Sequence, residues 1–303
     1  MESIDKSSIS SSLLSDDGYR WLLLRSRDME MKTAAAAQLF AEAGVNAIVF
    51  KGWSVARWYP SERPRFYNDV DIAVQPLDHL NAERLRRDAE AVTPIDLHWG
   101  FRHYDDSPWD RLFSRTKIVK IDGIPVRVLC AEDELRIICA HWLNDGGTNK
   151  DRLWDIYYAV TNRQAGFDWD LCLNASGAHR SRWVSCAIQL AHKYLGLSLD
   201  GLPAQIRDYV VPGWVIRTIE REWESGIGLV PLLQCLSDSR LFWQQLKKRC
   251  PPNPIEATIE MSGDLSSPFR PYYQLGSFVL RARPSIKKIV RLAKIKAGRT
   301  KTE

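Results

Sequence analysis

The residues of this chain with the clearest chemical potential are Asp69 and Asp71, which flank one valine in an apolar run that ends at Val74. Side chains at positions i and i+2 of a strand point to the same side, so this spacing presents two carboxylates together. Like charges held that close repel, and a shared cation relieves the repulsion. Carboxylate oxygens, together with substrate phosphates, are the ligands that Mg²⁺ prefers. The pair therefore favours phosphoryl or nucleotidyl transfer over the common alternative, a surface turn or a helix cap.

Two neighbouring segments strengthen this interpretation. Upstream, the apolar run 47–50 ends at Lys51-Gly52. Downstream, Asp96 lies in a third β-compatible segment, and His98 follows two residues later on the same side. A two-metal site needs a further carboxylate, so Asp96 is predicted to complete the metal site or to take the proton of the attacking group. The alternatives are a strand-end ion pair for Asp96 and a packed, hydrogen-bonded imidazole for His98.

Taken in order, these residues resemble the polymerase-β-like nucleotidyltransferase superfamily. The pattern is most similar to uncharacterised bacterial nucleotidyltransferases, and more distantly to the abortive-infection toxin nucleotidyltransferases. The residues that carry the resemblance are Lys51-Gly52, Tyr59-Pro60, Arg65, Asp69-Val70-Asp71 and Asp96-Leu97-His98-Trp99. Arg152 and Asp155 are similar to a basic-acidic motif of the toxins. The chain departs from the superfamily at Trp53, where a second small residue is usual.

The resemblance implies a metal-dependent enzyme that transfers NMP from NTP to an acceptor and releases pyrophosphate. It implies Asp69, Asp71 and Asp96 as catalytic and metal-binding residues, with Mg²⁺ as the expected ion and Mn²⁺ as an alternative. The residues that it assigns to substrate binding are Lys51, Gly52, Ser54, Arg65, His98 and Arg152, although an ion pair at a helix start explains Arg152 equally well. The acceptor stays open among a small molecule, a sugar, a protein and an RNA. A non-catalytic nucleotide-binding or scaffolding protein that retains the fold is the alternative.

The elements that must position these residues form an α+β pattern. Hydrophobic periodicity predicts strands at 46–50, 69–75 and 94–101, a hairpin at 118–129 around Asp122-Gly123, and helices at 18–44, at 77–91 and from a Ser54 cap to residue 58. From residue 131 the pattern is mostly helical, at 132–143, 152–161, 182–195, 214–224 and 230–248, and 253–273 is predicted to be irregular. We expect a small mixed-sheet nucleotidyltransferase core with flanking helices, followed by a mostly helical C-terminal half. The expected segments are a disordered lead-in (1–17), a catalytic domain (18–130), a helical domain (131–280) and a basic tail helix (281–303).

Charge and composition set further limits. Residues 281–303 hold nine Lys or Arg and one acid, so this segment carries +8 while the whole chain carries +5. A tail of this kind can contact a polyanion, and a solvated helix is its common alternative. The six scattered cysteines predict buried thiols, and no run is apolar enough for a membrane span, so a cytoplasmic protein is expected. Neither a P-loop, a Rossmann fingerprint nor a Gly-x-Ser-x-Gly motif is present, which weakens kinase, dehydrogenase and hydrolase interpretations.

Overall fold

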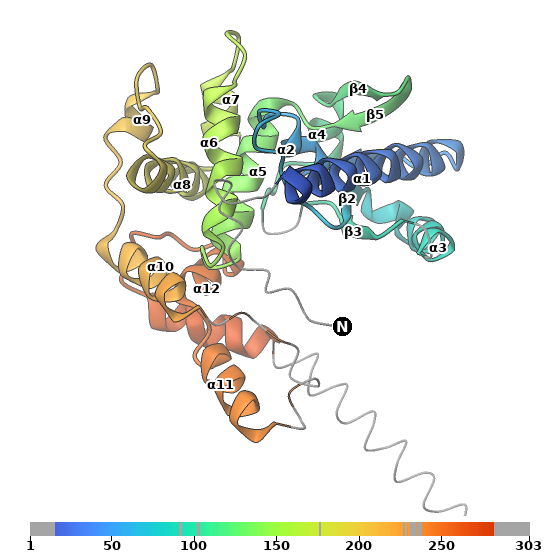
Figure 1. Cartoon of the computed structure of the whole chain (residues 1–303). Helices are drawn as coiled ribbons and strands as arrows, with labels where there is room; N and C mark the ends of the chain where they lie inside the picture. Colours follow the sequence, from blue (N-terminus) through green and yellow to red (C-terminus); the bar gives the residue numbers. More distant parts are fainter. Residues whose placement is uncertain are drawn as a thin grey trace, which may run out of the picture. The chain divides into compact units, whose positions relative to one another are not determined.

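The computed structural model describes residues 16–90, 93–101, 104–175, 177–226, 228, 230, 235 and 238–281. The chain divides into two compact units, coloured along the sequence in Figure 1. The first unit contains the residues up to Trp142 and Asn149–Val211, and the second contains Leu143–Thr148 and the residues from Pro212 onward. Within the described ranges, no helix is both long enough and apolar enough to cross a bilayer.

The first unit is built on one mixed five-stranded sheet. Its strands are β1 (Ala47–Val49), β2 (Val70–Val74), β3 (Ile95–Trp99), β4 (Lys117–Ile121) and β5 (Ile124–Val128). They lie in the order β3-β2-β1-β5-β4, in which β2 pairs with β3 and β1 with β5 in parallel, and the other two pairs are antiparallel. The predicted α+β class with a small mixed sheet is confirmed. Asp122 and Gly123, both at positive φ, make the predicted turn between β4 and β5.

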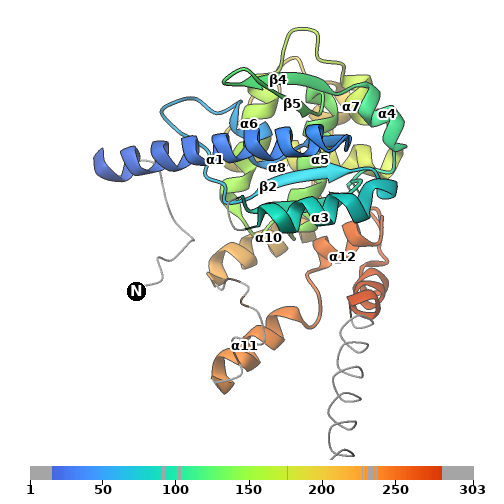
Figure 2. The same cartoon turned by 90° about the vertical axis from the view of Figure 1, so that its right-hand side faces the viewer.

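Helices cover both faces of this sheet. Those of the first unit are α1 (Asp16–Glu42), α2 (Gly52–Ala56), α3 (His79–Ala89), α4 (Trp109–Ser114), α5 (Ala131–Asn144), α6 (Leu153–Thr161), α7 (Trp169–Asn174), α8 (Ala178–Leu195) and α9 (Ala204–Arg207). Figure 2 shows α1 and α3 lying across one face. Val70, Ile72 and Val74 of β2 point into that layer and pack with Phe40 of α1. Because side chains alternate along a strand, Asp71 and Ala73 point to the opposite face.

That opposite face packs against α4 and α5. Ile48, Phe50 and Ala73 of the sheet form a buried cluster there with Leu112 of α4 and Ile137 of α5. Full burial of side chains of this size stabilises a fold by about 1.5–3 kcal/mol each. The two apolar layers therefore hold β2 rigidly between them, and Asp71 lies on the α5 side of a fully covered strand.

The second unit is helical and contains α10 (Gly213–Ser225), α11 (Ser239–Arg249), α12 (Pro254–Glu260) and a helix over residues 270–281. Two predictions in this region need correction. The last part of the helix predicted at 230–248 is α11, which begins at Ser239 because the Asp238 carboxylate accepts from the N–H groups of Arg240 and Leu241; residues 231–234, 236 and 237 lie outside the described residues. The segment 253–273 is irregular only at 261–269: Asn253 caps α12, and Pro254 takes its first position, where a missing N–H costs no hydrogen bond.

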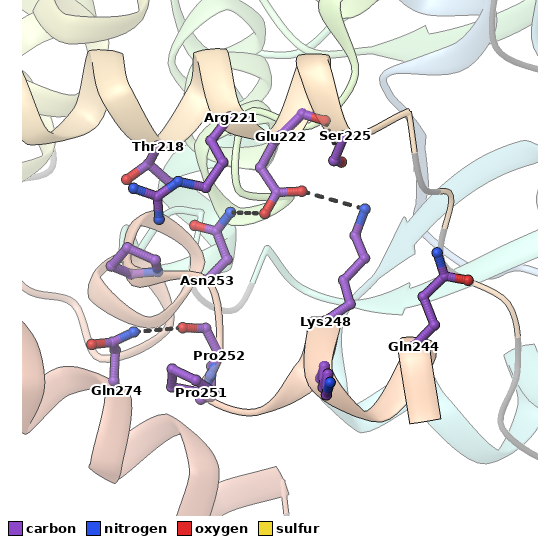
Figure 3. A pocket seen from close by; sticks show the side chains of 12 residues that line it. Thr218, Arg221, Glu222, Ser225, Gln244, Lys248, Pro251, Pro252, Asn253 and Gln274 are labelled. Atoms are coloured by element: carbon purple, nitrogen blue, oxygen red, sulfur yellow. Dashed lines mark hydrogen bonds and ion pairs between the residues drawn. The ribbon is translucent and has the colours of Figure 1, made fainter. Parts of the chain in front are cut away.

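A pocket of about 500 Å³ lies in the second unit, between α10, α11 and residues 251–254. Figure 3 shows Glu222 at its centre, between Asn253 and Lys248. Asn253 Nδ2 and Lys248 Nζ lie 3.5 and 3.4 Å from the two Glu222 carboxylate oxygens. The polar groups in the middle of this pocket thus pair with one another.

All six cysteines are free thiols, as predicted from their spacing. Five of them are buried, and Cys250, which follows α11, is exposed. Burial raises the pKa of both Cys130 and Cys186 to about 12, so these thiols stay protonated at neutral pH.

Candidate active site

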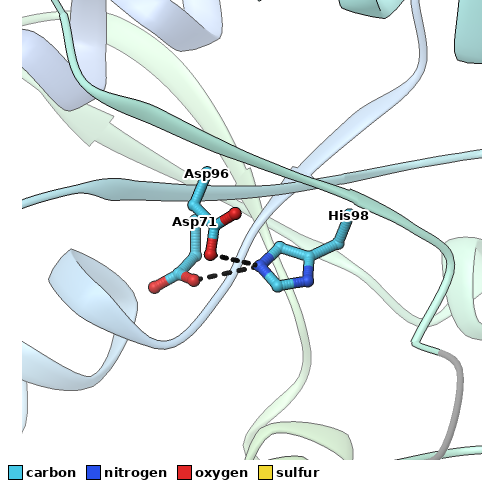
Figure 4. A group of neighbouring side chains, drawn as sticks. All are labelled: Asp71, Asp96 and His98. Atoms are coloured by element: carbon cyan, nitrogen blue, oxygen red, sulfur yellow. Dashed lines mark hydrogen bonds and ion pairs between the residues drawn. The ribbon is translucent and has the colours of Figure 1, made fainter. Parts of the chain in front are cut away.

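The parallel register of β2 and β3 sets the geometry of the predicted acids. Asp71 lies opposite Asp96, and Ala73 lies opposite His98. His98 Nε2 is 3.2 Å from Asp71 Oδ1 and 3.1 Å from Asp96 Oδ2. Figure 4 shows this nitrogen pointing between the two carboxylates. One donor atom from each of the three residues lies within 4.8 Å of the others, the spacing of a metal-ligand set.

Lys51 completes the charge balance of this group. Its Nζ lies 2.7 Å from Asp71 Oδ1, and both side chains are buried. Burial opposes ionisation of Asp71, but the hydrogen bond from His98 and the charge of Lys51 outweigh it and lower its pKa to about 2. Burial likewise disfavours a charged imidazole, yet hydrogen bonds to Asp71 and Asp96 raise the pKa of His98 above its ordinary value. Asp71 is thus a carboxylate at neutral pH, paired with the Lys51 ammonium and hydrogen-bonded to His98.

Asp69 is placed differently from its partner in the Asp-x-Asp motif. It precedes the first residue of β2 and is exposed, so the i, i+2 rule of a strand does not align it with Asp71. Partial desolvation, followed by the negative charges of Asp71 and Asp96, raises its pKa. Asp69 therefore lies within electrostatic range of the group while its oxygens stay outside the set of three.

The residues present fit a divalent cation. Two carboxylates and one imidazole converge, and the charges of Asp71 and Asp96 also act on the nearby Asp69, whose pKa is raised first by desolvation and then by these charges. Asp96 is exposed and Asp71 is buried, so the group opens to solvent from the Asp96 side. A cation bound here would compete with Lys51 for the Asp71 carboxylate.

The turn between β1 and α2 brings Lys51 to this group. Lys51 adopts φ 52°, ψ −133°, a conformation that non-glycine residues rarely occupy. Its N–H donates to Glu134 Oε1 at 2.7 Å, and the Ser54 hydroxyl donates to Glu134 Oε2 at 2.7 Å. Ser54 lies inside α2, so its prediction as a helix cap is wrong, because the helix already begins at Gly52. The buried carboxyl of Glu134 therefore holds the turn from α5.

Glu134 is the main site residue that sequence reasoning missed. It follows Glu132 and Asp133 at the start of α5, and three consecutive acids give no sign of which one is buried. Burial raises its pKa to about 7. Asp133 of the same run belongs to a separate buried network with Arg115 and Arg136, behind the site.

Gly52 approaches the acids closely. A Cβ built on it would lie 3.4 Å from the Asp69 carbonyl oxygen and 3.6 Å from Asp71 Oδ2. These distances are ordinary van der Waals contacts, and the φ of +20° is the feature that disfavours a side chain here. The absence of a side chain leaves the backbone of this turn bare beside the Asp71 carboxylate.

Arg65 does not point freely toward this group. Its Nε and Nη2 donate to the two oxygens of Asp155 at 2.6 and 2.8 Å, and its Nη1 donates to the Gly52 carbonyl at 3.1 Å. The Tyr59 hydroxyl also donates to Asp155. Tyr59 and Arg65 thus form one buried cluster with Asp155, which is 90 residues or more away in the sequence, and Arg65 links this cluster to the Lys51-Gly52 turn.

Arg152 lies at the rim of the Arg65–Asp155 cluster. It ends a short 3₁₀ turn (Lys150–Arg152), and its Nη1 is 3.7 Å from Asp155 Oδ2. Its side chain is 39% exposed. This arrangement matches the ion pair at a helix start that was the alternative to substrate binding, and it leaves part of the guanidinium open to solvent.

The structure also defines the surroundings of Trp53, where the chain departs from the superfamily pattern, and of His141. Trp53 is buried in the layer between the sheet and α1, where its Nε1 donates to Glu30 at 3.3 Å. The bulky side chain therefore lies in the core. His141 of α5 feels the charges of the site: burial, and then the positive charge of Lys51, lowers its pKa to about 3. It is a neutral imidazole close to the acids.

Comparison with known proteins gives one finding for part of the chain. Residues 84–196 match a family described as an uncharacterised nucleotidyltransferase. The match covers β3 with Asp96 and His98 and extends to α8, and it begins after Lys51 and Asp71. The resemblance to nucleotidyltransferases is confirmed over these residues and supports a role in nucleotidyl transfer. No curated protein matches the chain.

Proposed function

We propose that this chain is a metal-dependent nucleotidyltransferase that moves NMP from an NTP to an acceptor and releases pyrophosphate. The observation that carries the proposal is the convergence of Asp71, Asp96 and His98 beside Lys51, in a chain whose residues 84–196, with Asp96 and His98, match a nucleotidyltransferase family. We assign catalysis to residues 18–130, with α5 and α6 of the same compact unit supporting the site from outside that range.

Asp71 and Asp96 would hold the ion, and Asp69 would lie at the exposed edge of the site. His98 would be either a nitrogen ligand or the hydrogen-bond donor that orients both carboxylates. When bound, a divalent ion supplies charge neutralisation at the phosphate under attack. A purely carboxylate set suits Mg²⁺, whereas ligation by the imidazole would favour a transition metal such as Mn²⁺.

The other residues have roles set by their contacts. Lys51 forms an ion pair with Asp71 and would supply positive charge to a triphosphate. Gly52 keeps a side chain away from Asp71 Oδ2. Asp96 is exposed and ionised, since its hydrogen bond to His98 lowers its pKa. It would either bind the ion or, as the alternative, accept the proton of an acceptor hydroxyl, for which the lowered pKa makes it a weak base.

Ser54 and Arg65 act through the backbone in this proposal. The Ser54 hydroxyl is bound to Glu134, and Arg65 is bound to Asp155 and the Gly52 carbonyl, so both fix the turn that presents Lys51. Arg152, with its partly exposed guanidinium, is the residue that we assign to triphosphate or acceptor contact.

A second candidate function is favoured by one observation. Lys51 forms an ion pair with Asp71 and His98 forms a hydrogen bond with it, so this buried carboxylate has protein partners without any ion, as expected for a non-catalytic nucleotide-binding protein that retains the fold. The two candidates differ in whether the acids are needed for turnover or only for binding.

The test incubates the full chain with each labelled NTP, with Mg²⁺ or Mn²⁺, and with candidate acceptor pools, and follows pyrophosphate release and labelled products by mass spectrometry. Asp71→Asn and Asp96→Asn should each lower turnover by about 100-fold or more, since each removes a charge from the reacting centre. Asp88→Asn, an exposed acid of α3, is the matched control and should leave turnover unchanged. Metal-dependent NTP binding without pyrophosphate release from any pool would favour the non-catalytic candidate.

A further inference from the structure

The helix over residues 270–281 has two chemically different faces. Its inner face is fixed to α12 by polar contacts: Ser277 Oγ donates to Glu260 Oε2 at 2.5 Å, and Arg281 Nη2 lies 2.7 Å from Glu256 Oε1. Gln274 Nε2 donates to the Pro252 carbonyl at 2.7 Å. Ser277 is fully buried in this contact. The orientation of the helix within its unit is therefore set by its polar side.

The outer face of the same helix is apolar and open to solvent. Five large apolar side chains on this side of the helix, and Phe269 just before it, are between 43% and 68% exposed, and we call these six residues the outer face: Phe269, Tyr272, Leu275, Phe278, Val279 and Leu280. Positions 272, 275 and 279 recur at helical spacing, so the exposure forms a continuous stripe. Soluble monomers seldom expose apolar side chains in such a contiguous group unless a partner covers them.

The sequence that continues from this face is strongly basic. From Arg281 to the last residue, nine Lys or Arg stand against Glu303 alone. An apolar face joined to a cluster of cations is the combination that binds an anionic lipid surface, where apolar groups enter the interface and cations meet the headgroups. The charge and the exposed face thus point to the same kind of partner.

Two other partners fit less well. The phosphates of a nucleic acid would bind the cations, but the aliphatic side chains of Leu275, Val279 and Leu280 would stay exposed to water. A second copy of the chain could cover the outer face, but it would bring two segments of +8 together. We therefore propose that the outer face is a docking surface for an anionic lipid bilayer, a partner that the charge of the sequence after it also favours.

The test measures co-sedimentation of the full chain with vesicles of phosphatidylcholine alone or mixed with phosphatidylglycerol. Binding should require the anionic lipid and weaken as salt is added. Leu275→Ser/Phe278→Ser should weaken it about tenfold or more, because both side chains would lose their place in the interface. Lys287→Gln/Lys288→Gln/Arg291→Gln should also weaken it about tenfold or more, because three charges are removed near the surface.

Leu77→Ser/Leu80→Ser is the matched control, since both leucines are more than 80% exposed but lie in the first unit. This pair should leave vesicle binding unchanged. All variants change exposed or terminal side chains, and circular dichroism confirms that each is folded.

Three outcomes would overturn the proposal. One is the absence of binding to anionic vesicles, whatever the result of a parallel fluorescence-polarisation assay with RNA; binding to RNA alone would assign the basic residues to a nucleic acid. Another is binding that the basic substitutions weaken and the Leu275→Ser/Phe278→Ser pair does not, since adsorption would then be purely electrostatic. The last is a dimer in light scattering that this pair converts to a monomer, which would assign the outer face to a second copy.

Discussion

The Glu134 carboxyl lies in the protein interior and binds two donors of the Lys51 turn at the same time. The pKa of this carboxyl is about 7 in the folded protein and has its ordinary value of 4.5 in the unfolded chain. Between these two pH values the folded protein therefore keeps a proton that the unfolded chain has lost. This contribution to stability is complete below about pH 4.5 and is lost as the pH rises to about 7.

The variant Glu134→Gln should remove this pH dependence. Its amide can accept from the Lys51 N–H and donate to the Ser54 oxygen, so the turn keeps both contacts. As the pH rises from about 5 to about 8, the free energy of unfolding of the parent chain should fall relative to that of the variant. This change in the difference between the two proteins should be at most about 3 kcal/mol. Urea unfolding at both pH values measures this. A constant difference between the two proteins would show that Glu134 does not titrate in this range.

The Asp155 carboxylate gives a second prediction at the residue scale. Asp155→Asn leaves the buried Arg65 guanidinium without a charged partner and should lower the free energy of unfolding by about 3–5 kcal/mol. Arg152→Ala removes a partly exposed partner of the same carboxylate at 3.7 Å and should cost less than about 1 kcal/mol. Chemical denaturation compares the two. If Asp155→Asn is as stable as Arg152→Ala and only raises the KM for NTP, then Arg65 binds substrate and its pairing is not structural.

Single residues of the site were predictable to different degrees. Asp71, Asp96 and His98 stand out because a polar side chain interrupts an apolar strand pattern at a fixed spacing. Asp69 has the same sequence signal as Asp71, but the strand begins one residue after it, and no pattern fixes a strand end to within one residue. The pairing of Arg65 with Asp155 joins positions 90 residues apart, and only the folded sheet brings them together.

At the scale of elements, the parallel pairing of β2 with β3 is what turns two sequence motifs into one site. A shift of one residue in this register would send Asp96 to the apolar layer under α3. The turn between β1 and α2 is the second essential element, since Lys51 and Gly52 both adopt positive φ values there.

Gly52→Ala tests this turn. The new methyl group fits sterically, so the cost comes from the φ of +20° and should be about 1 kcal/mol of stability. The rate of nucleotidyl transfer should fall by more than this loss of stability explains, because the methyl group lies beside Asp71 Oδ2. Gly100→Ala is the matched control, with φ +63° and open space around it: a similar loss of stability with unchanged turnover is expected. Equal turnover in both variants would place the phosphates away from this turn.

The sequence predicted the long elements better than the short ones. α1, α5 and α8 span three or more turns, so their apolar periodicity is clear, and the strands are apolar runs bounded by turn residues. The helices α4, α7 and α9 have six, six and four residues, too few to show a period. The sequence does not predict α12, because its segment is rich in Pro and Ser, although Pro254 starts the helix. The predicted lead-in and basic tail lie almost entirely outside the described residues.

At the scale of the whole molecule, the chain passes between its two units three times, at residues 142, 148 and 211. All residues of the candidate site belong to the first unit, and the outer face belongs to the second. Catalysis and membrane docking, as proposed, would therefore be properties of different compact units.

Hydrogen exchange measures this division directly. Metal and NTP together, at about 100 times their dissociation constant, stabilise the state that binds them by about 2.7 kcal/mol. Protection should rise in α2, β2 and β3, while α10, α11 and α12 should be unchanged, because they contribute no ligand. An equal rise in both units would show that they unfold as one cooperative block.

The distribution of the thiols offers a practical route to the arrangement of these units in solution. With five sulfur atoms enclosed in the interior, a maleimide dye or spin label should react at Cys250 in the native chain without any engineered cysteine. The attached reporter would follow the second unit alone, and its mobility would report the tumbling of that unit. Its distance from a paramagnetic ion bound by the acids of the first unit would also be measurable on the unmutated protein.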